Sequence, residues 1–201
     1  MLELSDLELR IRPSRPYGGW VRPLRLMGYT AVGLDLSEDE APRFQIEVGE
    51  GVRCFLRAPA AEFPWVDACS HADAAKRRKP PSLLVVGLAD RVDEVDSYLA
   101  AHPNRVEALE LSLAEVRKKY ESDPSGTFRW TSSLARAAAV RGIPVLVSSS
   151  AASPAELSTC LTKVAFEGIL RTGRRSTRTR ERRFLRRLEQ VVSTRGRTGT
   201  D

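Results

Sequence analysis

Hydrophobic residues in the first half of the chain recur mainly at the two-residue period of β-strands. Leu7, Leu9 and Ile11 alternate with charged residues, which predicts a strand at residues 4–11. Residues 83–88 (LLVVGL) are almost wholly apolar, as is typical of a parallel strand buried on both faces. Further short patterns predict a helix at 21–27 and strands at 29–36, 44–48 and 52–57.

The second half of the chain follows the period of helices, interrupted by short apolar strands. Asp90 is an N-cap residue before a helical pattern, and Ser153, Pro154 and Glu156 together predict a capping box with a first-turn proline. We therefore expect helices at 90–101, at 128–141, from 153 onward and at 177–192, strands at 106–113 and 143–147, and a mobile loop centred on residues 122–126.

Helices that alternate with apolar strands predict an α/β fold with a largely parallel sheet. A barrel and an open sheet both fit this order. Eight repeats in about 170 residues would be shorter than ordinary (β/α)₈ units, so a barrel must lack helices, most plausibly around residues 36–81. We expect one domain at 1–170, a basic linker and C-terminal helix at 171–192, and a disordered tail at 193–201.

Composition changes the picture through charge. The 201 residues are 42% hydrophobic, and neither a membrane-length apolar run nor a secretory signal is present, so we expect a soluble, cytoplasmic protein that binds no membrane. The net charge is +6. Residues 171–201 hold eleven arginines and three acidic residues, which is +8, whereas residues 1–170 carry −2. The basicity is therefore concentrated near the C-terminus.

No pattern of catalytic or metal-ligating residues emerges. Cys69, His71 and Asp73 would share one face of an extended chain, but we expect a solvated loop there, and His102 before a proline reads as a helix terminator. The glycine pairs match neither of the common nucleotide-binding loops. The serines at 148–150 lack a neighbouring histidine base and are expected to close a strand and cap the next helix. We predict no catalytic residue, no metal site and no cofactor bound by the protein.

A dense set of arginines is the chief candidate site, because such density destabilises a chain unless an anionic partner neutralises it. Arginine also suits bidentate phosphate contacts. Aromatic residues are only 6% of the chain, so we expect RNA recognition through backbone and shape rather than base stacking. The predicted RNA-binding residues are Arg171, Arg174, Arg175, Arg178, Arg180, Arg182, Arg183, Arg186 and Arg187, with a second patch at Lys76, Arg77, Arg78 and Lys79.

Three stretches of sequence carry a family resemblance. Residues 6–10 (DLELR) with 27–32 (MGYTAV), residues 107–115 (EALELSLAE), and most specifically residues 128–151 (FRWTSSLARAAAVRGIPVLVSSSA) resemble the thirty-kilodalton barrel-type protein subunit of archaeal and eukaryotic ribonuclease P. The likeness extends over most of residues 4–170. The chain departs from the family pattern in its shortness at 36–81 and in its arginine-dense C-terminal helix.

The resemblance implies a TIM-like barrel, related to metal-dependent phosphoesterases but without their ligands. It implies a non-catalytic subunit that binds the ribonuclease P RNA and pairs with a small ferredoxin-like protein subunit. The RNA, with its own magnesium, would then remove the 5′ leader of precursor tRNA. Arg129 sits at the arginine position of the family motif and is a candidate contact with RNA or a partner, as is Arg57 at the end of a predicted strand.

A second hypothesis belongs to a different functional class. A stand-alone metal-dependent phosphoesterase would use Asp6, His71, Asp73 and other carboxylates at strand ends. It predicts turnover of a phosphate ester by the pure protein with added manganese or zinc. A general basic RNA chaperone is a third reading, and it predicts equal affinity for unrelated RNAs.

Overall fold

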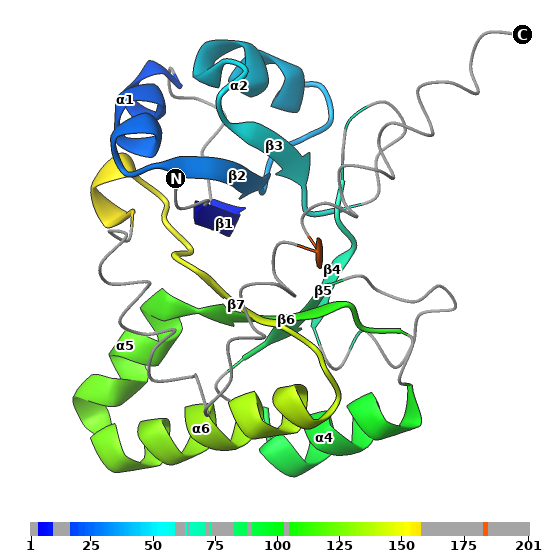
Figure 1. The fold of residues 1–201 in the computed structure, drawn as a ribbon. Coiled ribbons are helices and arrows are strands. Elements are labelled where there is room, and N and C mark those ends of the chain that lie inside the picture. Colours follow the sequence, from blue (N-terminus) through cyan, green and yellow to red (C-terminus); the bar gives the residue numbers. More distant parts are fainter. Residues whose placement is uncertain are drawn as a thin grey trace, which may run out of the picture.

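The computed structural model contains two parallel β-sheets with helices on their outer sides (Figure 1). It describes residues 4–9 (backbone only, except for Leu9), 17–58, 63, 65–70, 73, 83–87, 90–102, 105–157 and 183–184. The elements are β1 (Leu4–Leu9), α1 (Gly18–Leu26), β2 (Tyr29–Leu34), α2 (Ala41–Val48), β3 (Arg53–Leu56), β4 (Ala68–Ser70), β5 (Leu83–Val86), α4 (Val92–Ala101), β6 (Ala108–Ser112), α5 (Leu113–Ser122), α6 (Pro124–Val140), β7 (Val145–Ser148) and a 3₁₀ turn η1 (Pro154–Glu156).

All strand pairs of the two sheets are parallel. One sheet has the order β1-β2-β3 and the other β4-β5-β6-β7. Isolated parallel bridges join Leu9 to Ala151 and Leu56 to Trp65, where the sheets approach each other. The α/β class with parallel sheets is confirmed, and the strands of the described residues form two sheets rather than one closed barrel.

Apolar residues of both sheets meet in a shared layer, which we call the inter-sheet core. It combines small side chains, Ala31 and Ala108, with the large ring of Phe55. Phe184 belongs to the same layer, although it lies far along the chain. The inter-sheet core consists of Ala31, Phe55, Val66, Leu83, Ala108, Leu146 and Phe184.

Two further cores lie between each sheet and its helices. Leu24 of α1 and Phe44 of α2 pack against the first sheet, and both are fully buried. Leu99 of α4 and Leu134 of α6 pack against the second sheet in the same way. Both faces of each sheet are therefore covered, which explains why the strands are rich in apolar residues.

The expected strands at 4–11, 29–36, 52–57, 83–88, 106–113 and 143–147 are each present, usually in shortened form. The expected helices at 21–27, 90–101 and 128–141 are also present as α1, α4 and α6. The short strand β4 was not predicted, because its three residues lie in an irregular, proline-rich stretch. The Asp90 carboxylate accepts a hydrogen bond from Gly87 N (2.9 Å) instead of capping α4, whose N-cap is Arg91.

The predicted strand at residues 44–48 is wrong, because this segment is the second half of helix α2. Phe44, Ile46 and Val48 fit a two-residue period, yet Ile46 is 79% exposed. Ala41, Phe44 and Val48 form the buried stripe at helical spacing. The Gln45 side chain then fixes the helix to β3, since its Oε1 accepts from Cys54 N at 2.9 Å.

The predicted loop at residues 122–126 is also wrong. Helix α5 runs to Ser122, and α6 begins at Pro124, so that Asp123 alone separates them. Asp123 Oδ1 accepts a hydrogen bond from Gly126 N (2.9 Å), which is an N-cap. The polar, proline- and glycine-containing stretch is therefore a helix start with Pro124 in the first turn, not a loop.

The helix predicted from Ser153 onward differs from the structure at its start. Neither reciprocal bond of a capping box is made: the Glu156 carboxylate accepts from Ala152 N rather than from Ser153 N, and Ser153 Oγ bonds the same carboxylate rather than a backbone N–H. The result is the 3₁₀ turn η1, which ends before an extended Leu157. The rest of that predicted helix lies outside the described residues, as do the predicted tail at 193–201 and all of the helix at 177–192 except Arg183 and Phe184.

None of the helices in the described part of the chain has both the length and the apolar character needed to cross a bilayer.

Candidate nucleic-acid interface

Only one of the nine predicted C-terminal arginines lies within the described residues. Arg183 is helical and exposed. Its neighbour Phe184 is only 3% exposed and packs in the inter-sheet core. The buried Phe184 therefore attaches this point of the chain to the folded domain, with the exposed Arg183 beside it. The other C-terminal arginines and the patch at Lys76, Arg77, Arg78 and Lys79 lie outside the described residues.

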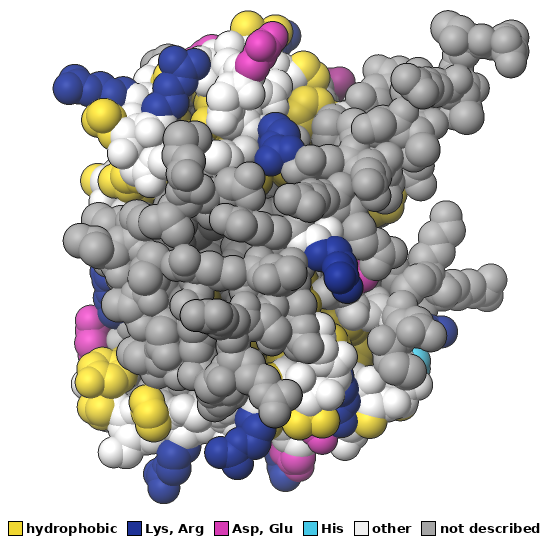
Figure 2. Space-filling model, viewed as in Figure 1, with side chains coloured by type: hydrophobic (Ala, Val, Ile, Leu, Met, Phe, Trp, Pro, Cys, Tyr) yellow, Lys and Arg dark blue, Asp and Glu magenta, His cyan; other side chains and the backbone are white. Residues whose placement is uncertain are grey.

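Arg129 lies on the first turns of α6 and is exposed. It lines a shallow, open depression of about 460 Å³ where α5 meets α6. Two aromatic side chains line the same depression, Tyr120 at 56% exposure and Phe128 at 55%. Hydrophobic side chains are visible at the lower left of Figure 2, over α5 and the beginning of α6, with basic side chains below them. The remaining lining residues are Pro124 and Ser125.

The corner between α5 and α6 is held by several local bonds. Thr127 Oγ1 donates to the Asp123 carbonyl at 2.7 Å, alongside the cap that Asp123 makes with Gly126. Trp130 Nε1 donates to the Asp90 carbonyl (2.9 Å), and the Lys119 ammonium lies 5.9 Å from the centre of the Trp130 ring. These contacts fix the directions in which the exposed side chains of the corner project.

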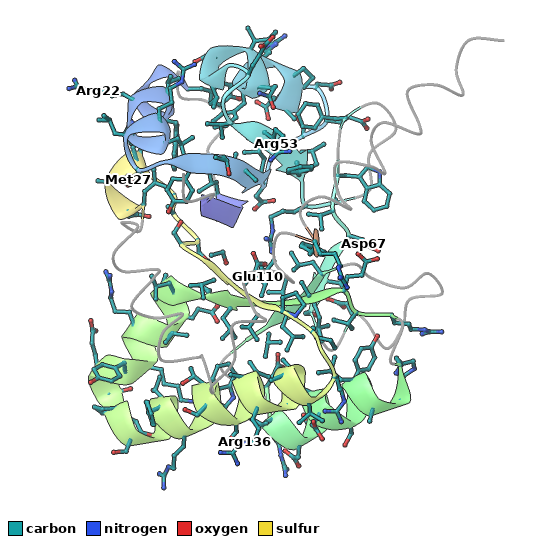
Figure 3. The ribbon with its side chains drawn as sticks, viewed as in Figure 1. Arg22, Met27, Arg53, Asp67, Glu110 and Arg136 are labelled. Atoms are coloured by element: carbon teal, nitrogen blue, oxygen red, sulfur yellow. The ribbon has the colours of Figure 1, made fainter. Side chains whose placement is uncertain are left out.

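Several other cations are exposed on helices α5 and α6. Arg117 and Lys118 project from α5, and Arg136 projects away from the fold below α6 (Figure 3). Arg141, by contrast, bonds Asp96 of α4 at 2.5 Å. Helices α5 and α6 thus present four cations to solvent: Arg117, Lys118, Arg129 and Arg136.

Arg57 occupies a different environment from that of an RNA contact. Its side chain is 13% exposed and forms an ion pair with Glu110, with Arg57 Nη2 2.7 Å from Glu110 Oε2 and Nη1 3.0 Å from Oε1. Figure 3 shows Glu110 in the region between the two sheets. This burial argues against the predicted RNA contact at Arg57 and favours a structural role.

The buried Glu110 is a structural feature that the sequence pattern did not reveal. Residues 106–113 alternate between apolar and polar side chains, yet every residue of β6 is buried, and Glu110 is 0% exposed. The polar face of this strand points toward the other sheet rather than to water. A buried carboxylate is stable there because the guanidinium of Arg57 faces it.

Serines cluster where β6 and β7 end. Ser150 Oγ donates to Ser112 Oγ at 2.7 Å, and Ser112 Oγ accepts from Glu115 N at 3.3 Å, which caps α5. Ser149 Oγ accepts from Ala151 N at 3.2 Å. Ser150 has a φ of 55°, a left-handed conformation that is uncommon outside glycine. Ser148 ends β7, as expected, but none of Ser148, Ser149 and Ser150 caps a helix within the described residues: the N-cap of α5 is Ser112, which Ser150 contacts.

The residues considered for a metal site do not form one in the described part of the chain. Cys69 packs in the core beneath α4, where burial and the nearby Asp73 carboxylate raise the pKa of its thiol to about 11. Asp73 accepts a hydrogen bond from Ser70 Oγ at 2.5 Å. His71 lies outside the described residues, and those that are described contain no group of three ligands able to hold a metal ion.

A comparison of the chain with protein-family models gives no match, and a search of curated proteins likewise gives no significant match.

Proposed function

We propose that this chain is a non-catalytic RNA-binding protein, acting as a protein subunit of ribonuclease P. The observation that carries the proposal is that the exposed Arg183 directly precedes the buried Phe184 in the chain. Phe184 is buried in the inter-sheet core, so that the exposed Arg183 beside it is held at the surface of the folded domain. Because Arg183 is held in place by its buried neighbour before RNA binds, the ordering cost of this contact is reduced.

The fold is compatible with the family that the sequence resembles. We propose that the two parallel sheets, bridged at Leu9–Ala151 and Leu56–Trp65, are parts of one shortened TIM-like barrel. The most specific stretch of the resemblance, residues 128–151, spans most of α6 and all of β7. Arg129, at the arginine position of that motif, is exposed and therefore able to contact RNA.

In this proposal the arginines neutralise phosphates and fix the geometry of the ribonuclease P RNA, while the RNA and its magnesium carry out cleavage of the 5′ leader from precursor tRNA. The small ferredoxin-like subunit would be the protein partner. The contacts are electrostatic and independent of sequence, so affinity falls steeply with salt. Arg57 is left out of this surface, because its guanidinium is committed to Glu110.

Salt dependence tests the role of the C-terminal arginines. Replacing Arg182, Arg183, Arg186 and Arg187 by alanine should flatten the plot of log affinity against log salt by roughly 0.9 for each lost phosphate contact on a duplex. The matched control replaces four exposed cations elsewhere, Arg22, Arg43, Arg53 and Arg91, and removes the same charge. Equal flattening in both variants would refute a localised surface.

Purification from the native host tests the identity of the RNA. We expect one abundant structured RNA to accompany the protein at moderate salt, with activity on precursor tRNA that RNA digestion abolishes. RNA recovered in proportion to cellular abundance would instead favour a general RNA chaperone. Phosphate-ester turnover by the RNA-free protein with manganese or zinc, lost on His71→Ala, would favour the metal-dependent phosphoesterase.

A further inference from the structure

The depression at the α5–α6 corner combines features that neither helix needs for folding. Five large hydrophobic side chains of the described residues are strongly exposed, and two of them, Tyr120 and Phe128, line this one depression. The other three are Leu26, Ile46 and Val140. Two aromatic rings beside a solvent-facing hollow provide flat apolar surfaces that a planar group can cover.

Neither ring serves the core. The buried side of α5 is formed by Leu113 and Val116, and that of α6 by Thr127, Thr131 and small residues that follow. Phe128 follows Thr127 directly, so it projects roughly 100° from Thr127 around the helix and lies just outside the buried stripe, at 55% exposure. Burial therefore does not account for the aromatic character of Tyr120 and Phe128.

Charge indicates what kind of group the depression accepts. Arg129 is the only charged residue among its lining residues, and Ser125 adds a hydroxyl. The exposed Arg117 and Lys118 lie on the same short helix as Tyr120. The acidic residues Glu121 and Asp123 are close to the depression in sequence, but neither lines it, and the Asp123 carboxylate accepts from Gly126 N. An aromatic surface next to a guanidinium fits a ligand that is both planar and anionic.

We propose that this depression holds one unpaired nucleotide of a single-stranded RNA segment. The base stacks on the ring of Phe128 or Tyr120, and the Arg129 guanidinium binds an adjoining phosphate. The volume of about 460 Å³ lies within the range of about 300–1,000 Å³ that proteins use for small ligands, which accommodates a base and its ribose. This inference rests on the proposed RNA binding, and it adds a stacking contact to the phosphate contacts of the C-terminal arginines.

Stacking and charge neutralisation have different signatures. Loss of one stacked base weakens binding of a single strand by about 5- to 150-fold and leaves the salt slope unchanged. Loss of a phosphate contact lowers the salt slope by about 0.7 on a single strand. Phe128→Ala and Tyr120→Ala should show the first signature, and Arg129→Ala the second.

The experiment uses the full-length protein with two fluorescent probes, a short oligouridine and a blunt-ended RNA duplex. We expect Phe128→Ala, Tyr120→Ala or both to weaken oligouridine binding and to leave duplex binding unchanged, with Phe128→Trp retaining affinity. Val140→Ala is the matched control for the aromatic variants, because it truncates an exposed apolar residue at the other end of α6. Arg22→Ala, at an exposed arginine of α1, is the matched control for Arg129→Ala. Circular dichroism checks that each variant is folded.

The outcomes separate this inference from the proposed function. Wild-type binding of both probes with no loss in the double variant Tyr120→Ala/Phe128→Ala would overturn the stacking site and leave RNA binding intact. Failure of the wild type to bind either probe would overturn the proposed function itself. Unchanged oligouridine binding, together with loss of a co-purified protein from Phe128→Ala, would overturn the inference and assign the depression to a protein partner.

Discussion

Arg57 at the end of β3 and Glu110 in the middle of β6 form a two-contact ion pair that joins the two sheets. The distances are 2.7 Å and 3.0 Å, and the side chains are 13% and 0% exposed. A charge pair in this position specifies how the sheets face each other, because any other alignment would leave each buried charge without its partner. The pair therefore contributes to the uniqueness of the fold as well as to its stability.

Glu110→Gln should lower the free energy of unfolding by about 3–5 kcal/mol, since it removes the negative charge that the buried guanidinium faces. The midpoint of urea denaturation, measured at constant m, checks this. Asp93→Asn is the control, because the pair between Arg91 and Asp93 is at the surface and its loss should not shift the midpoint. An apolar pair, Arg57→Met with Glu110→Leu, should recover much of the lost stability; a Glu110→Gln protein as stable as the wild type would contradict the role of the pair.

Phe184→Ala should destabilise the protein by about 3–5 kcal/mol, because it removes a large side chain from the inter-sheet core and leaves a cavity. The neighbouring Arg183→Ala, at an exposed position, should change stability by less than about 0.5 kcal/mol. Thermal unfolding of both variants makes the comparison. Equal melting temperatures would mean that the C-terminal segment is not anchored through Phe184.

The corner between α5 and α6 depends on the Asp123 cap. Asp123→Ala should cost about 0.5–2 kcal/mol. Gly126→Ala should cost a similar amount, since a Cβ there would collide with the Asp123 carboxylate.

Combining the two corner substitutions gives a sharper test. Once Asp123 is alanine, the added methyl at residue 126 has no carboxylate to displace, and alanine is favoured over glycine in a helix by about 0.5–1 kcal/mol. Gly126→Ala should therefore change from destabilising to stabilising in the Asp123→Ala background. Additive costs in a double-mutant cycle would show that the two residues act independently.

Alkaline pH should weaken the fold through its buried thiols. Burial raises the pKa of Cys54 to about 12, and burial with the charge of Asp73 raises that of Cys69 to about 11, from an ordinary value of 9.0. Above pH 9 the unfolded chain loses these protons first, so stability is full below pH 9 and falls as pH rises toward 11–12. Cys54→Ala should reduce the slope of denaturation midpoint against pH. An unchanged slope would refute the contribution of this thiol.

Most strands could be predicted from sequence because their burial leaves a direct mark on composition. The run at 83–88 is apolar for the reason expected, since Leu83 faces the inter-sheet core and Leu84 faces the helices. Helix α2 was misassigned because a five-residue window at 44–48 fits both periods. Including Ala41 and Pro42 would have favoured the helix, since proline is common in the first turn.

The candidate site was less predictable than the fold, because it depends on contacts between residues that only the folded structure brings together. Arg129 could be singled out, but its two aromatic neighbours come together only through the sharp corner at Asp123, where a loop was expected. Glu110 is explained only by Arg57, 53 residues earlier in the chain. A pattern along one strand shows which residues share a face, and not whether that face meets water or a charged partner.

The position of Phe184 also sets an order of events during synthesis. A ribosome adds residues from the N-terminus at about 5–20 per second, and Phe184 lies 36 residues beyond the end of β7. Both sheets are therefore complete about 2–7 s before the last side chain of the core between them has been made. A chain released prematurely in that interval would hold both sheets but lack the Phe184 ring between them, and would expose an apolar gap.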